Sequence, residues 1–198
     1  MFTEMVKRFV FLLLLLVGVS AFALRLKPNS YYVCYVTKVS DGDTIHCRFP
    51  YPVSDKVKSY PVRLIGIDTP ETGVRKKNTG KQAVEIEKII KGSYGINKEI
   101  TKREVVNLGL EAKRFTEKLL QRVYVVTLET DVRPYDRYGR VLGYIWLPDG
   151  KMLNEEIICN GYALPLTVPP NVKYQKLFLK CFKKALREKR GLWGELTY

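Results

Sequence analysis

The chain has 198 residues, 46% of them hydrophobic, and a formal net charge of +14. This length suits one ordinary domain with a targeting segment and excludes two large domains. Such an excess of basic residues favours a polyanionic partner, either a nucleic acid or an anionic membrane surface, although solubility alone would also explain it.

The N-terminal residues have the pattern of an export signal. Lys7 and Arg8 precede an almost wholly apolar run over residues 9–19, and small residues follow. The run is shorter than the about 20 apolar residues that usually cross a bilayer. We therefore expect a signal peptide over residues 1–23, with an uncleaved anchor or a buried helix as alternatives. A single domain over residues 24–198 would then be secreted or held in the cell envelope.

In five segments of this domain, β-branched and aromatic residues predominate, which is typical of strands. They span residues 31–39, 44–49, 62–67, 123–128 and 141–146. Asp41 and Gly42 form a hairpin turn between the first two.

Helical patterns lie between and after these strands. They cover residues 82–91, a stretch capped by Thr101, residues 154–159, and a final stretch introduced by residues 169–171. The first should end at Gly92, and Thr101 with Glu104 forms a capping box. Together the elements predict a small closed barrel of the α+β class with about three helices, although a sandwich or an open sheet would also fit.

The cysteines are widely spaced, at positions 34, 47, 159 and 181. They include no C-x-x-C pair, and His46 is the only histidine, so the pattern argues against a structural zinc site. Cys34 and Cys47 flank the hairpin turn on one face, so they form either a disulfide or two buried thiols.

Three short segments carry acidic residues and arginines for which hydrophobic strands have no structural use. They cover residues 41–44, 63–72 and 136–140. Each alone is typical of a turn or a loop. Together they supply carboxylates for a metal ion, a carboxylate that activates water, and two guanidinium groups for a five-coordinate phosphorus. The combination indicates phosphodiester hydrolysis.

The order of D-G-D-T, R-L-x-G-I-D-T-P-E and D-R-Y-G-R, followed by G-K-M-L-N-E and a basic helix ending in G-L-W, resembles the thermonuclease (staphylococcal-nuclease-like) family. The resemblance covers roughly residues 31–193. It implies a five-stranded OB-fold β-barrel and a Ca²⁺-dependent endonuclease. By the same resemblance, the enzyme cuts DNA and RNA with little sequence specificity and leaves 3′-phosphate ends.

The matching positions imply a metal site made of oxygen atoms. Asp43 and Asp68 resemble the direct carboxylate ligands of Ca²⁺, and the backbone carbonyl of Thr69 resembles a third ligand. Asp41 resembles the accessory acid beside the metal.

Five further positions match residues that act on the phosphate or the water. Glu71 resembles the general base, and Arg63 and Arg140 resemble the arginines that grip the phosphate. Lysine would be a poor replacement for either arginine because the planar guanidinium matches phosphate geometry. Arg137 and Tyr138 match positions that contact the terminal phosphate of a nucleotide.

The chain departs from the family pattern in two places. Residues 72–100 form a longer, more basic connection, whose lysines could either follow a nucleic-acid backbone or belong to a solvated insertion. The tyrosine that stacks on a base has no counterpart at residues 166–168, so stacking is either weaker or supplied by Tyr162.

Two other classes of protein compete with a nuclease. A non-catalytic nucleic-acid-binding module could share the fold, but such modules usually lose the acidic and arginine residues that are present here. A membrane-surface protein would leave the acidic residues unexplained. No sequence feature indicates a stable protein partner, so we expect a monomer, tethered to a membrane only if the signal is uncleaved.

Overall fold

Residues 24–54 and 56–197 are described by the computed structural model, and the expected signal over residues 1–23 lies outside them. Five strands form a closed barrel in the order β1-β2-β3-β6-β5, with β5 pairing back onto β1. These strands are β1 (Tyr31–Asp41), β2 (Thr44–Arg48), β3 (Ser59–Leu64), β5 (Val125–Glu129) and β6 (Val141–Trp146). All pairs are antiparallel except β3 with β6. The predicted five-stranded α+β barrel is confirmed.

The strand predicted over residues 62–67 is interrupted, and the interruption positions the acidic residues. Gly66 has a φ of +84°, and a Cβ there would lie 2.3 Å from the ring of Phe178. The chain therefore leaves the barrel after β3 and forms β4 (Ile67–Asp68), which pairs with β7 (Leu164–Pro165) in a separate sheet. Asp68 consequently lies beyond the end of the barrel.

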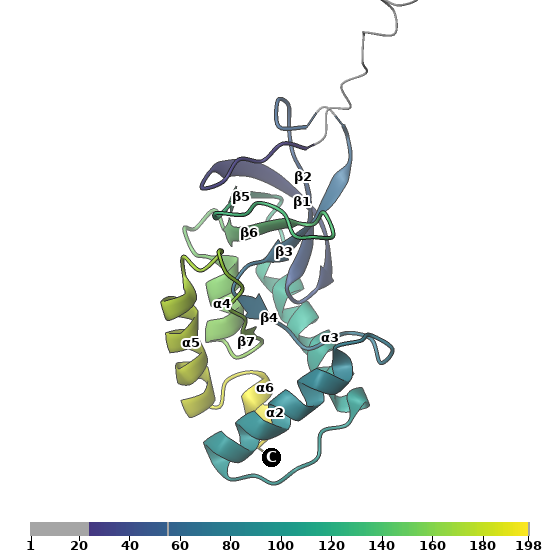
Figure 1. The fold of residues 1–198 in the computed structure, drawn as a ribbon, viewed down its shortest axis with the longest axis vertical. Coiled ribbons are helices and arrows are strands. Elements are labelled where there is room, and N and C mark those ends of the chain that lie inside the picture. The colour runs from purple at the N-terminus through teal and green to yellow at the C-terminus, as the bar shows by residue number, and fades with distance from the viewer. Residues whose placement is uncertain (1–23, 55, 198) are drawn as a thin grey trace, which may run out of the picture.

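Five helices occur in the described residues, where about three were expected. They are α2 (Thr79–Tyr94), α3 (Lys102–Leu119), α4 (Leu153–Cys159), α5 (Gln175–Arg187) and the single turn α6 (Leu192–Glu195). The barrel lies at one end of the molecule, and α2 and α6 lie at the other (Figure 1). No helix in this part of the chain combines the length and apolar character needed to cross a bilayer.

The capping box of Thr101 and Glu104 is confirmed, but two predicted helix ends are wrong. Helix α2 continues through Gly92, which faces open space, and ends where Gly95 adopts a φ of +71°. An exposed glycine inside a helix costs only about 1 kcal/mol relative to alanine, so it need not end the helix. Helix α5 begins at Gln175 rather than near residue 170, because Val168 and Asn171 first pair in a β-bridge.

Two apolar clusters stabilise the two ends of the molecule. One fills the barrel and extends to α4 and α5. The other joins α2 to α3 and α6 through Ile86, Ile90, Val105 and Trp193, each at most 1% exposed. Residues 79–94 are therefore a packed part of the domain.

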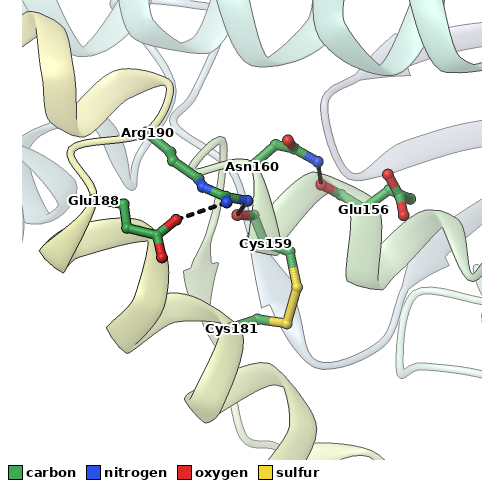
Figure 2. The surroundings of a disulfide bond; sticks show 6 residues. All are labelled: Glu156, Cys159, Asn160, Cys181, Glu188 and Arg190. Atoms are coloured by element: carbon green, nitrogen blue, oxygen red, sulfur yellow. Dashed lines mark hydrogen bonds and ion pairs between the residues drawn. A yellow bond between two sulfur atoms is a disulfide. The ribbon is translucent and has the colours of Figure 1, made fainter.

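All four cysteines are paired. Cys34 and Cys47 join β1 to β2, which settles the alternative in favour of the disulfide. Cys159 at the end of α4 is joined to Cys181 in α5, a pair that the sequence did not predict (Figure 2). Glu155 lies with these two sulfur atoms in the one trio of metal-capable side chains found among the described residues. Because the disulfide uses both thiols, this trio is not a metal site.

Candidate active site

A hollow of about 330 Å³ brings together residues that are far apart in the sequence. We call it the acidic cleft, and it is lined by Asp41, Asp43, Thr44, Arg63, Asp68, Thr69, Pro70, Glu71, Lys76, Asn78, Arg140 and Leu166. All seven residues predicted for catalysis or metal binding line it. Residues from the β1–β2 turn, the β3–β4 region and the turn before β6 thus meet at one place.

The β1–β2 turn places Asp43 in the cleft. A Cβ at Gly42 would lie 2.8 Å from the side chain of Thr69, so glycine allows this turn to approach Thr69 closely. Thr116 in α3 donates a hydrogen bond of 2.7 Å to the carbonyl oxygen of Gly42. One Asp43 oxygen, Oδ2, accepts hydrogen bonds from Thr69 N at 2.8 Å and Thr69 Oγ1 at 3.0 Å. The carboxylate is therefore buried and fixed.

The guanidinium of Arg63 lies between two of the predicted metal ligands. Its Nη1 is 2.9 Å from Asp43 Oδ2, and its Nη2 is 2.5 Å from Asp68 Oδ1. Nη1 also donates to the carbonyl oxygen of Ile67 at 2.9 Å. Burial raises the pKa of Asp68, the positive charge of Arg63 opposes this shift, and the charges of Asp43 and Glu71 add to it. Arg63 thus offsets repulsion between carboxylates crowded into a small volume.

The predicted base, Glu71, shares a cation with the accessory acid. Lys76 Nζ lies 3.1 Å from Glu71 Oε2 and 2.8 Å from Asp41 Oδ2. Partial burial favours a lower pKa for Lys76, but its hydrogen bonds to these two carboxylates raise it, so it is an ammonium ion. One lysine of the basic connection therefore lines the cleft, whereas Lys77 and Lys81 do not.

Arg140 is oriented by its own turn. Its Nε donates to Asp136 Oδ2 at 2.7 Å, while Asp136 Oδ1 accepts from the backbone N–H groups of Tyr138 and Arg140. Burial favours a higher pKa for Asp136, but these hydrogen bonds lower it, so the carboxylate is ionised. The ion pair uses Nε and leaves both Nη groups of Arg140 available to donate to a ligand.

The chain is similar to proteins of a known family. The family model described as staphylococcal nuclease homologue matches residues 61–195. The chain belongs to this family. It is 35% identical over 159 residues to a thermonuclease of Staphylococcus intermedius, covering 80% of this chain and 74% of that protein. It is 36% identical over 161 residues to a thermonuclease of Staphylococcus hyicus, with coverages of 80% and 74%.

A more distant relative is also named as a nuclease. The chain is 25% identical over 166 residues to Endonuclease YhcR of Bacillus subtilis, a match that spans 83% of this chain and 12% of that protein. These relatives support a nuclease of the staphylococcal nuclease family.

The donor atoms of the cleft suit a hard cation. Asp43, Asp68 and the carbonyl group of Thr69 offer oxygen atoms, and the cleft lining contains no histidine or cysteine. Oxygen ligands from carboxylates and carbonyls are those that Ca²⁺ prefers, and Ca²⁺ tolerates irregular coordination. The residues present therefore fit the metal that the family implies.

A second hollow, of about 350 Å³, adjoins the acidic cleft and shares Arg63, Arg140 and Leu166 with it. We call it the Tyr138 pocket, and the remainder of its lining includes Arg133, Arg137, Tyr138, Val168, Pro169 and Pro170. The Arg137 guanidinium lies 4.8 Å from the centre of the Tyr138 ring, and its Nη2 donates to the Tyr138 hydroxyl at 2.6 Å. Both residues predicted to contact a nucleotide phosphate thus line this pocket.

The structure does not place Tyr162 where it could stack on a base in either hollow. Its ring is stacked on Phe115 with a centroid distance of 4.1 Å and an interplanar angle of 15°. Tyr162 lines neither hollow. Tyr138, which is 70% exposed, is an aromatic side chain that lies beside the cleft and is open to solvent.

Sequence reasoning missed two residues that hold the acidic segment in place. Gly109 in α3 is one, because a Cβ there would lie 2.5 Å from the carbonyl oxygen of Glu71 and 2.6 Å from that of Pro70. A glycine inside an otherwise strong helical pattern was a usable signal of this close approach. Gln82 in α2 is the other, and a single glutamine in a basic stretch gave no comparable signal.

Proposed function

We propose that the chain is a Ca²⁺-dependent endonuclease that hydrolyses phosphodiester bonds of DNA and RNA with low sequence specificity and leaves 3′-phosphate ends. The convergence of seven acidic, arginine and threonine residues from distant segments on one cleft carries this function. Titratable groups that crowd together in a cleft and have neighbours that shift their pKa values, as Asp68 does, are typical of functional sites, which favours a catalytic site over a structural one.

Three groups of the cleft would hold the metal ion: the carboxylates of Asp43 and Asp68 and the carbonyl oxygen of Thr69. Asp41 would act beside it as an accessory acid. When bound, Ca²⁺ would neutralise a non-bridging phosphate oxygen and make the phosphorus more electrophilic.

Glu71 is the proposed general base. Its carboxylate would orient a water molecule in line with the departing 5′ oxygen and accept a proton as the new P–O bond forms. The bond from phosphorus to the 5′ oxygen breaks, and that oxygen takes a proton from solvent to become the 5′-hydroxyl. Lys76 and Asn78, which approach the two carboxylate oxygens of Glu71 at 3.1 and 3.5 Å, restrict the directions in which this carboxylate can point.

Arg63 and Arg140 would stabilise the charge that grows on the equatorial phosphate oxygens. Both line the acidic cleft and the Tyr138 pocket, so a phosphate at their boundary would reach both hollows. The neighbouring nucleotide would then lie in the Tyr138 pocket, where Arg137 and Tyr138 would contact its terminal phosphate. The exposed ring of Tyr138 would also offer a face on which its base stacks.

We further propose that this single domain, residues 24–198, acts outside the cytoplasm as a monomer after export by residues 1–23. Two disulfides in a domain of this size fit an oxidising compartment, since cytosolic thiols are usually kept reduced.

The decisive experiment incubates the purified protein with single-stranded DNA and with RNA, first with Ca²⁺ and then with a chelator. Calcium-dependent cleavage of both, with 3′-phosphate ends identified by mass spectrometry, is expected. Tight binding without cleavage in any divalent metal would instead favour a non-catalytic nucleic-acid-binding module of the same fold.

A further inference from the structure

Helix α2 inserts one buried amide among the groups proposed to bind metal and activate water. The side chain of Gln82 lies in the first turn of α2, and the residue is 3% exposed. Its Nε2 donates to Asp68 Oδ2 at 2.8 Å and to the carbonyl oxygen of Thr69 at 3.0 Å. Its Oε1 accepts from the backbone N–H of Glu71 at 2.8 Å.

The partners of Gln82 fix the orientation of its amide. The NH₂ group faces two acceptors, and the oxygen faces a donor. Rotating the amide by 180° would oppose its oxygen to a carboxylate and a carbonyl, and its NH₂ to an N–H. Only the observed orientation of the Gln82 amide satisfies all three partners, and it uses both N–H groups of Nε2.

We propose that Gln82 is a positioning residue of the nuclease site, an inference that rests on the function proposed above. Through one amide it holds the Asp68 carboxylate, directs the Thr69 carbonyl and fixes the backbone of Glu71. Helix α2 therefore does more than lengthen the basic connection, because it carries the residue that positions the proposed metal ligands and base.

Packing and hydrogen bonds hold the segments that carry Gln82 and Glu71 in place. Thr79, fully buried at the start of α2, donates to the carbonyl oxygen of Gly73 at 2.8 Å. Further along α2, Ile86 and Ile90 pack in the same apolar cluster as Val105 of α3. On its other side the Glu71 backbone lies against Gly109 of α3. The base is therefore held between two helices that are packed on each other.

Outer residues that orient metal ligands typically change metal affinity or activity by about 10–100-fold when they are removed. Gln82→Met keeps the length of the side chain and removes its donors and its acceptor. We expect calorimetric titration of this variant with Ca²⁺ alone to give an affinity about 10–100-fold weaker than that of the wild type. The value of kcat at saturating Ca²⁺ should fall, while KM for single-stranded DNA should change by less than about twofold.

Ile86→Ala is the matched control, because Ile86 is buried one turn further along α2 and does not line the acidic cleft. It should lower the urea midpoint of unfolding and leave the Ca²⁺ affinity of the folded protein unchanged. If Ile86→Ala weakens Ca²⁺ binding as much as Gln82→Met, helix packing explains the effect and the positioning role is wrong.

Gln82→Asn is a gentler variant in case Gln82→Met does not fold. Its amide is one methylene too short to reach all three partners, so an intermediate loss of Ca²⁺ affinity is expected. Wild-type Ca²⁺ affinity and kcat in the folded variants would overturn the positioning role and leave the nuclease function intact. A wild-type protein without Ca²⁺ binding or Ca²⁺-dependent cleavage would overturn the proposed function itself.

Discussion

The acidic cleft and the Tyr138 pocket adjoin each other but are built differently. In the cleft, charged groups are held by one another: Asp43 is 6% exposed and is bound by Arg63 and Thr69. In the Tyr138 pocket, Val168 and neighbouring prolines form an apolar wall, and Tyr138 is 70% exposed. Arg63 and Arg140 line both hollows. The same two arginines therefore connect a site of fixed charges to an exposed binding surface.

Because the two hollows are built differently, we expect changes in one to affect the rate of catalysis and changes in the other to affect substrate binding. Groups that are fixed before the substrate arrives stabilise a transition state without reorganisation, so changes in the cleft should act mainly on kcat. An exposed aromatic residue beside apolar side chains contributes similarly to ground state and transition state, so changes in the Tyr138 pocket should act mainly on KM.

The largest expected effect follows from removing the proposed base. Glu71→Gln keeps the size of the side chain but cannot accept the proton of the attacking water, so kcat should fall by about 10²–10⁴-fold. KM for single-stranded DNA should stay near the wild-type value. Steady-state kinetics at saturating Ca²⁺ would check both, with Glu117→Gln on the exposed face of α3 as the control. Near-normal turnover in Glu71→Gln would remove the assignment of Glu71 as the base.

Arg140→Lys should have the next largest effect. The variant keeps the positive charge but loses the planar fork, which breaks the Nε contact to Asp136 and the paired donation to phosphate. Loss of such a preorganised donor typically costs about 10²–10³-fold in kcat. Arg114→Lys, at an exposed position of α3, is the matched control. Equal kcat in Arg140→Lys and the wild type would show that charge alone is sufficient at position 140.

The sequence predicted the barrel and the composition of the site for a physical reason. Strand patterns and turn residues are local signals that can be read from the sequence. The acidic and arginine residues were recognisable because they have no structural role in hydrophobic strands. The predicted ends of strands and helices were wrong where contacts between distant segments determine them. Gly66 ends β3 because Phe178 packs against it. Helix α2 continues through Gly92 because its buried face packs on α3.

The same limit explains what was missed in the site. The pairing of Cys159 with Cys181 depends on how α4 packs against α5, and no periodic pattern encodes it. Gln82 acts through three hydrogen bonds to residues 11 to 14 positions away. Individual polar side chains give no signal of their partners until the chain is folded.

Tyr138→Ala tests the Tyr138 pocket. Stacking of a base on an aromatic ring contributes about 1–3 kcal/mol, so KM for single-stranded DNA should rise by about 5–150-fold while kcat changes little. Tyr124 offers a matched control, because it is 74% exposed and lines neither hollow. A fall in kcat with unchanged KM would show that Tyr138 belongs to the catalytic cleft instead, and would remove the proposed separation between the two hollows.

The smallest expected effect concerns the lysine in the acidic cleft. Lys76 pairs with Asp41 and Glu71, so its ammonium competes with a metal ion for the negative charge of the cleft. An ion pair with a side chain this exposed contributes little, and Lys76→Met should lower the Ca²⁺ concentration for half-maximal rate by about two- to fivefold. Lys77→Met, next to it and exposed, should leave that concentration unchanged. A higher Ca²⁺ requirement in Lys76→Met would mean that the positioning of the two carboxylates by Lys76 outweighs its competition with the metal ion, and the prediction would be wrong.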